Sequence, residues 1–222
     1  MSSDREKQLA AEAAAELVED GMRVGLGTGS TVAFLLPALA ARGLDLRCVA
    51  TSLATEQTAR ELGMRVESFA GVDALPQLDI AIDGADQVAP DGWLVKGGGA
   101  AHTREKAVAA AADRFVVIVS SEKLVERLSP PVPLELLEFG LGATLARLGQ
   151  VRLRDVPRSP DGGVIADYMG EFDDPADIAN MLAATVGVVE HGLFPAGMTP
   201  DVIVAHGDHV EPMRAGRGRL VR

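Results

Sequence analysis

Residues 22–41 read MRVGLGTGSTVAFLLPALAA, and the order of residue types in this stretch decides the expected fold. The first six residues are mainly apolar and have the length of a short buried strand. A glycine turn follows, and an apolar helix is expected from Thr31 to Ala41. A strand, a tight glycine turn and a helix in immediate succession begin an α/β unit.

The same alternation continues along the chain. Apolar runs predict further strands at residues 46–51, 78–83 and 114–120, and helices are expected at 54–63 and 104–112. Strands that alternate with helices indicate an α/β domain on a mainly parallel, Rossmann-like sheet.

A helix is also expected ahead of this unit. Ser3 and Glu6 fit a capping box, apolar residues then recur at four-residue spacing, and Gly21 can end the helix.

The composition changes after residue 128, where SPPVPLELLEFG carries three prolines. From there to Phe194 we expect helix, strand, glycine-glycine turn, strand, helix and strand, an order that suits a small α+β domain such as a split βαβ sandwich. The apolar run PDVIVAHG then returns a strand to the first sheet. The predicted division is an α/β domain of residues 1–128 and 200–222, with residues 129–199 as the smaller domain.

The composition excludes several classes of protein. Of 222 residues, 47% are hydrophobic, which supports a real core, yet no apolar run is long enough to span a bilayer. The net charge of −11 argues against nucleic-acid binding, since no basic face is available to neutralise phosphates. The single cysteine, Cys48, cannot form an internal disulfide and fits the cytoplasm. We therefore expect no membrane or nucleic-acid partner.

The glycine turn after the first strand resembles a dinucleotide fingerprint but fails it, because Ser30 stands where the third glycine belongs. It also lacks the Gly-Lys pair of a P-loop. What remains is a helix N-terminus with two hydroxyl residues, Ser30 and Thr31. Such a turn either binds a phosphate through free N–H groups or is an ordinary strand-to-helix connection.

Two further loops carry charge. Asp83 and Asp86 lie in DGAD at the expected carboxyl end of a strand, where they can bind a cation, share acid and base roles, hold sugar hydroxyls, or simply form a turn.

Lys96 precedes three glycines, Gly97 to Gly99, whose N–H groups can surround an anion or oxyanion. Glu105 follows near the start of a helix as a candidate general base. The alternative is a flexible loop beside a charged surface.

Taken together, these segments resemble ribose-5-phosphate isomerase, type A, over nearly the whole chain. The matching segments, in chain order, are GLGTGST, TSLATEQTARELG, DIAIDGAD, LVKGGGAAHTREKAVA, FVVIVSSEKLV and GVVEHGLF. The resemblance implies an α/β domain with a smaller inserted ferredoxin-like domain. It also implies interconversion of ribose 5-phosphate and ribulose 5-phosphate through a cis-enediolate, without a cofactor or metal, in a homodimer or homotetramer.

The resemblance further assigns roles to residues. Glu105 becomes the catalytic base, and Asp83, Asp86 and Lys96 join it as catalytic residues. The implied substrate-binding residues are Thr28, Gly29, Ser30, Thr31, Asp83, Gly84, Ala85, Asp86, Lys96, Gly97, Gly98, Gly99 and Lys123.

Several positions depart from the family pattern, namely Gln87, His102, Thr103 and the turn SPDGG at residues 159–163. These departures affect the expected contacts of the small domain more than the proposed catalytic residues.

Two other functions stay open: a non-catalytic sugar-phosphate sensor on the same fold, and a sugar-phosphate deaminase or lactonase. The sensor is disfavoured because such regulators normally carry an added DNA-binding helix pair, and the deaminase because DGAD and KGGG together fit it poorly.

Overall fold

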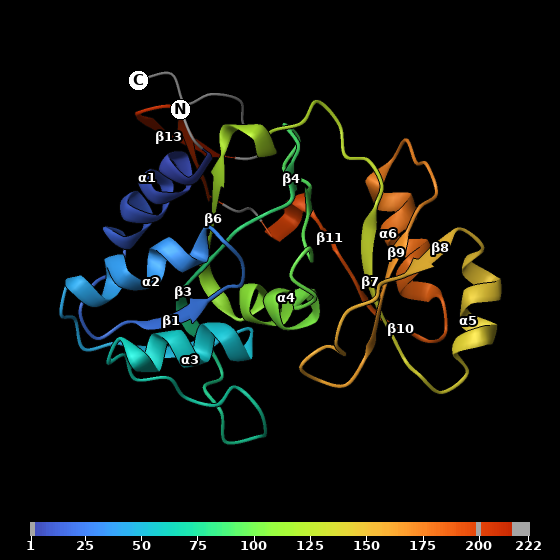
Figure 1. The fold of residues 1–222 in the computed structure, drawn as a ribbon, viewed down its shortest axis with the longest axis horizontal. Helices are drawn as coiled ribbons and strands as arrows, with labels where there is room; N and C mark the ends of the chain where they lie inside the picture. The colour runs from blue at the N-terminus through green and yellow to red at the C-terminus, as the bar shows by residue number, and fades with distance from the viewer. Residues whose placement is uncertain (1–2, 199–200, 215–222) are drawn as a thin grey trace.

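The computed structural model describes residues 3–198 and 201–214. Its largest sheet has six strands in the order β13-β12-β6-β3-β1-β2 (Figure 1). All neighbouring pairs are parallel except β12 with β13, so the expected α/β fold with a mainly parallel sheet is confirmed. The strands of this sheet are β1 (Arg23–Leu26), β2 (Arg47–Ala50), β3 (Leu78–Asp83), β6 (Ala112–Ser120), β12 (Asp201–His206) and β13 (His209–Arg214).

Helices cover both faces of this sheet, because successive side chains of a strand point to opposite faces. Val116 and Ile118 of β6 pack in the apolar cluster that contains residues of α1 and α2. Val117 and Val119 pack in the cluster that contains Val108 of α4. Burial on both faces explains why the strands read as continuous apolar runs. The helices are α1 (Ser3–Ala15), α2 (Val32–Ala41), α3 (Leu53–Glu61) and α4 (His102–Ala110).

Helix α1 differs from the expectation at both ends. It ends well before Gly21, and the capping box between Ser3 and Glu6 is wrong. The Glu6 carboxylate instead accepts the N–H groups of Ser121, at 2.9 Å, and Gly207, at 2.8 Å. These long-range bonds tie α1 to the ends of β6 and β12, and they lower the pKa of Glu6.

A second, four-stranded sheet is antiparallel, with the order β10-β7-β9-β8. Together with two helices it encloses a separate apolar cluster, and we call this sheet and its helices the small lobe (Figure 1). Its elements are β7 (Val132–Leu136), α5 (Leu141–Leu148), β8 (Val151–Leu153), β9 (Val164–Tyr168), α6 (Pro175–Ala184) and β10 (Val188–His191).

The expected order of helix, strand, glycine-glycine turn, strand, helix and strand is confirmed by α5, β8, β9, α6 and β10, but the expectation left out strand β7, which precedes them. All five residues of β7 are buried, and the strand lies between β9 and β10. Its partners are distant in sequence, so pairing with them outweighs the local signal of a proline-rich run.

A third sheet of short strands, β11-β5-β4, joins the two larger parts. Strand β11 (Leu193–Phe194) directly follows the small lobe and pairs with β5 (Leu94–Val95), which pairs with β4 (Gln87–Val88). Lys96 and the glycine run follow directly after strand β5 in the sequence. The division at residues 128, 129, 199 and 200 remains a prediction, and residues 199–200 and 215–222 lie outside the described residues.

None of the helices in residues 3–198 and 201–214 is long and apolar enough to cross a bilayer.

Candidate active site

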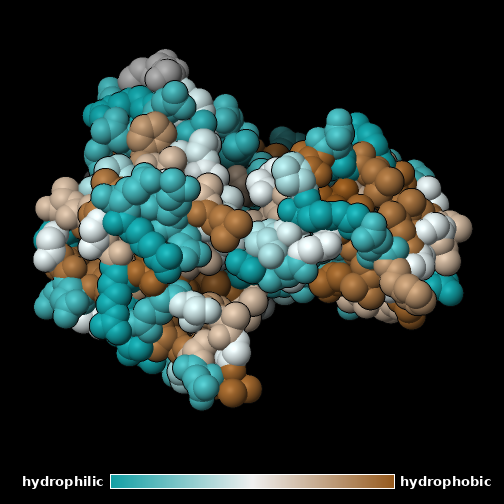
Figure 2. All heavy atoms as spheres, turned by 60° about the horizontal axis from the view of Figure 1, so that its bottom comes forward, coloured by the Kyte–Doolittle hydropathy of each residue, from teal (hydrophilic) through white to brown (hydrophobic). Residues whose placement is uncertain are grey.

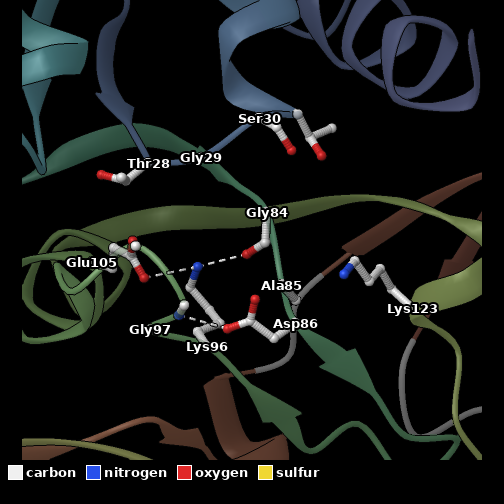
Figure 3. A pocket seen from close by; sticks show the side chains of 13 residues that line it. Thr28, Gly29, Ser30, Gly84, Ala85, Asp86, Lys96, Gly97, Glu105 and Lys123 are labelled. Atoms are coloured by element: carbon white, nitrogen blue, oxygen red, sulfur yellow. Dashed lines mark hydrogen bonds and ion pairs between the residues drawn. The ribbon is translucent and has the colours of Figure 1, made fainter. Parts of the chain in front are cut away.

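A pocket forms where the carboxyl ends of β1, β3 and β6 meet the loop after β5 (Figure 3). This edge is where open α/β sheets bind ligands. Every residue expected in the site lines this pocket except Asp83. The lining residues are Thr28, Gly29, Ser30, Thr31, Gly84, Ala85, Asp86, Lys96, Gly97, Gly98, Gly99, Glu105 and Lys123.

Asp83, Lys96 and Glu105 form a buried cluster beside the pocket. The Lys96 Nζ atom lies 2.9 Å from Asp83 Oδ2 and 3.0 Å from Glu105 Oε2, and none of the three side chains is more than 4% exposed. Lys96 also donates to the Gly84 carbonyl oxygen at 2.6 Å. Asp83 lies behind Lys96 and fixes its position, while Lys96 and Glu105 reach the pocket.

The charges of this cluster do not balance, because one lysine faces two carboxylates. Burial, together with the negative charge of Asp83, raises the pKa of Glu105 to about 8 despite the attraction of Lys96. Burial raises the pKa of Asp83 as well. Burial by itself lowers the pKa of Lys96, but the two carboxylates outweigh it and raise that pKa above its ordinary value. Lys96 thus stays charged, while Glu105 can exchange a proton near neutral pH.

Each position of the run requires glycine for a different geometric reason. Gly97 has a φ of 110°, a backbone conformation that residues with a side chain rarely adopt. A β-carbon on Gly98 would lie 2.7 Å from Asp86 Oδ1, and the other Asp86 oxygen accepts the Gly98 N–H at 2.8 Å. A β-carbon on Gly99 would lie 3.1 Å from Thr28 Cγ2. The run therefore lets the backbone lie against two facing loops.

The loop after β1 is held against Asp83. The Thr28 N–H donates to Asp83 Oδ1 at 3.1 Å, and a β-carbon on Gly27 would lie 2.0 Å from the same oxygen. Ser30 and Thr31 lead from this loop into α2. The N–H groups of Ala33 and Phe34 bond to the carbonyls of Gly29 and Thr31, so the N–H groups ahead of them, at Ser30 and Thr31, are the ones that can bind an anion at this end of the pocket.

Lys123 comes from a short 3₁₀-helix, η1 (Ser121–Lys123), that follows β6. Figure 3 shows its amino group pointing into the pocket from the side opposite Glu105. The pocket therefore has a cationic end, near Ser30 and Lys123, and a second end that carries the buried carboxylate.

Two threonines outside the expected set support the first loop. Thr51 Oγ1 lies 2.7 Å from Thr28 Oγ1, and Thr55 Oγ1 donates to the Gly27 carbonyl at 2.8 Å. Both follow β2, the neighbour of β1 in the sheet. The motif TSLATEQTARELG contains them, but nothing in their spacing marked which residues reach the site.

The departures from the family pattern lie outside the pocket lining. The Gln87 side chain exchanges two hydrogen bonds with the backbone of Ser129, both at 2.9 Å. His102 is fully buried, and Thr103 donates to Glu135 of the small lobe. In the SPDGG turn, Asp161 pairs with Arg104 of α4 at 2.7 Å. These residues join the small lobe to the rest of the chain.

A family model described as ribose 5-phosphate isomerase A (phosphoriboisomerase A) matches residues 47–209. The chain belongs to the ribose 5-phosphate isomerase A family. The ribose-5-phosphate isomerase A of Caulobacter vibrioides is 46% identical over 210 residues, which cover 87% of this chain and 91% of the relative. That of Natronomonas pharaonis is 43% identical over 224 residues, covering 94% and 96%.

Solved structures of the family extend the similarity to the fold. Ribose 5-phosphate isomerase A from Neisseria gonorrhoeae has a TM-score of 0.90 and 32% identity, covering 96% of this chain and 98% of that one. A D-ribose-5-phosphate isomerase in complex with phospho-erythronic acid has a TM-score of 0.87 and 34% identity, covering 96% and 100%. The resemblance found in the sequence motifs is therefore confirmed over nearly the whole chain.

Proposed function

We propose that this chain interconverts D-ribose 5-phosphate and D-ribulose 5-phosphate through a cis-enediolate. The observation that carries the proposal is the buried Glu105 carboxylate, 3.0 Å from a charged lysine and with its pKa raised to about 8. Membership of the ribose 5-phosphate isomerase A family supports the choice of substrate.

In the proposed reaction, Glu105 removes the proton from C2 of the open-chain sugar. The electron pair of that C–H bond forms the C1–C2 double bond, and the carbonyl oxygen at C1 gains negative charge. Lys96 and the Gly99 N–H group stabilise this oxygen, a kind of contact whose loss costs on the order of 10²–10³ in rate. The C2 hydroxyl gives its proton to the C1 oxygen, and the electron pair of that O–H bond forms the C2 carbonyl. The electron pair of the C1–C2 double bond takes the proton that Glu105 returns to C1, which leaves a hydroxyl at C1 and a ketone at C2.

The remaining roles follow from position. Asp83 holds Lys96 from behind, since its oxygens are occupied by Lys96 and by the N–H groups of Thr28 and Gly84. Asp86 lies at the pocket surface, where it can hold sugar hydroxyls and assist ring opening. We assign the phosphate to the opposite end, where Lys123 supplies a positive charge and α2 begins.

A direct assay tests this function. Purified protein is given ribose 5-phosphate with EDTA present, and ribulose 5-phosphate is detected. Turnover under these conditions supports a metal-independent isomerase. Tight binding of the sugar phosphate without turnover supports a sensor instead, and release of ammonia from an amino-sugar phosphate supports a deaminase.

The rate should depend on the ionisation of Glu105. We expect kcat/KM to fall by about tenfold per pH unit below pH 8, because only the ionised carboxylate can accept the C2 proton. The measurement is a pH profile with ribose 5-phosphate from about pH 6 to about pH 9.5. A rate that stays level from about pH 6 to about pH 8, as a glutamate with the ordinary pKa of 4.5 would give, would contradict the raised pKa.

We propose that the protein is a homo-oligomer, a dimer or tetramer, joined through the small lobe. Figure 2 shows apolar residues gathered over this lobe. Leu137, Phe139, Val186 and Val189 are all exposed, Phe139 by 95%, and the Leu137 N–H bonds to the carbonyl of residue 187, which brings the two segments together. An exposed apolar patch of this kind suits a second copy of the chain.

Light scattering after size-exclusion chromatography tests this interface. Phe139→Asp is expected to reduce the mass to that of a smaller assembly, because a charge cannot be buried there without a partner. Val72→Asp is the control, since Val72 is fully exposed outside the small lobe. A wild-type protein that runs as a monomer would contradict the proposal.

We further propose a cytoplasmic location, without membrane or nucleic-acid partners. The acidic net charge of −11 supports this. Cys48 is buried, and burial raises the pKa of its thiol to about 11, so it behaves as a small apolar side chain.

A further inference from the structure

Arg154, which directly follows β8, reaches from the small lobe to the glycine run of the pocket. Its Nη1 atom donates to the carbonyl oxygen of Gly97 at 2.9 Å and to that of Gly98 at 3.3 Å. Its own N–H bonds to Ile165 of β9 at 3.0 Å, so its backbone is fixed to the sheet. No motif in the sequence pointed to this residue.

A buried carboxylate holds the other side of the guanidinium. Asp167 of β9 is 3% exposed, and its Oδ1 accepts from Arg154 Nε at 3.0 Å and from Nη2 at 2.6 Å. This paired contact fixes the plane of the guanidinium. Nη1 is thereby aimed at the glycine run, and Arg154 is only 17% exposed.

Because the peptide bond is planar, the contacts of Arg154 with the two carbonyl groups also fix the directions of the N–H groups that follow them. In a trans peptide, the C=O and the following N–H point in opposite directions. When Arg154 holds the Gly97 carbonyl, the Gly98 N–H must point away from it, and it donates to Asp86 at 2.8 Å. When Arg154 holds the Gly98 carbonyl, the Gly99 N–H must also point away from the arginine, and Gly99 lines the pocket.

We infer that Arg154 is a positioning residue for the isomerisation: it holds the glycine run so that the Gly98 N–H binds Asp86 and the Gly99 N–H is left for the substrate. The inference rests on the proposed function. Glycines have the widest choice of backbone conformations, so a glycine run without such a holder can turn its N–H groups elsewhere. Negative charge develops on the sugar only in the transition state, so loss of this alignment lowers kcat more than it changes KM.

The test compares three variants. Arg154→Met removes the guanidinium, and Arg154→Lys keeps a positive charge facing Asp167 but cannot bond the carboxylate and the two carbonyls together. The matched control is Arg152→Met, because Arg152 also pairs with Asp167, at 3.3 Å, and is 65% exposed. We expect both Arg154 variants to lose about 10–10² in kcat with KM for ribose 5-phosphate changed by less than about threefold. Arg152→Met should change kcat by less than about twofold.

Two further readouts separate positioning from general instability. Added guanidinium should restore part of the kcat of Arg154→Met, because it can occupy the vacated position. Phospho-erythronic acid, whose planar carboxylate resembles the enediolate, should inhibit both Arg154 variants more weakly than the wild type. Amide hydrogen exchange at Gly98 should be faster in Arg154→Lys, and this readout does not need turnover.

The outcomes are distinct. A folded Arg154→Lys protein with wild-type kcat and unchanged Gly98 exchange overturns the inference and leaves the proposed function standing. An equal loss of kcat in Arg152→Met also overturns it, since the effect would then come from Asp167. A wild-type protein without isomerase activity overturns the proposed function, and faster Gly98 exchange in the variant would still show that Arg154 holds the run.

Discussion

Replacing Glu105 with glutamine is expected to lower kcat by a factor on the order of 10²–10⁴, the usual contribution of a positioned base. Glutamine has nearly the same shape, so KM for ribose 5-phosphate should change little. The control is Glu135→Gln, because Glu135 is also buried but lies outside the pocket. Steady-state kinetics of both variants check the prediction, and a Glu105→Gln protein with full activity would rule out the proposed base.

The same substitution should make the folded protein more stable at alkaline pH. The folded-state pKa of Glu105, about 8, is above its ordinary value of 4.5. Its contribution to stability is therefore fully present below pH 4.5 and is lost as the pH rises through 8, whereas glutamine does not titrate. Between these limits the free energy of unfolding should shift in favour of the variant by at least about 1 kcal/mol, the value of one pKa unit.

Denaturant unfolding at about pH 5 and about pH 9 measures that shift. A stability difference between variant and wild type that does not change with pH would contradict the raised pKa of Glu105. Loss of activity together with a gain in stability would mark Glu105 as a residue kept for chemistry.

Lys96→Met is expected to damage both rate and stability. The rate should fall on the order of 10²–10³, because the developing oxyanion loses its charged donor. The free energy of unfolding should fall by about 3–5 kcal/mol, because Asp83 and Glu105 lose the only cation that contacts them both among the described residues. The destabilisation should be smaller at acidic pH, where the two carboxylates are protonated.

Lys106→Met provides the matched control for this variant. Lys106 is largely buried, pairs with Glu190 at 2.7 Å and lies over the Phe194 ring, as Lys96 does. It does not line the pocket. We expect this variant to lose stability but to keep kcat within about threefold of the wild type. Equal losses of kcat in the two lysine variants would mean that Lys96 is needed only for folding.

Much of the pocket could be predicted from the sequence, because its parts sit at strand ends. The carboxyl ends of parallel strands meet at one edge of a sheet, so the loops that carry Thr28 and Asp86 were expected together without any knowledge of distances. Glu105 was a candidate base from its position near the start of the helix that follows the glycine run, and the family resemblance added Lys123. The burial of Asp83 was not foreseen, because it depends on three partners from separate loops.

Features set by contacts between distant segments could not be predicted. Arg154 is one of three arginines within residues 151–158, and nothing local distinguishes it from Arg152. The difference is that Arg154 alone of these two contacts the glycine run among the described residues. Glu6 is a second example of a contact that local sequence does not predict. Its carboxylate binds N–H groups at the ends of two strands instead of capping its own helix.

The position of β12 has a consequence for how the chain is made. Strand β6 is completed at Ser120, but its outer neighbour β12 begins only at Asp201, about 80 residues later. Until the ribosome has released that segment, the edge of β6 is unpaired and rich in valine and isoleucine, the kind of edge on which other chains add strands. The small lobe is synthesised during this interval, so each nascent chain carries an open, aggregation-prone edge until its C-terminal hairpin arrives to cover it.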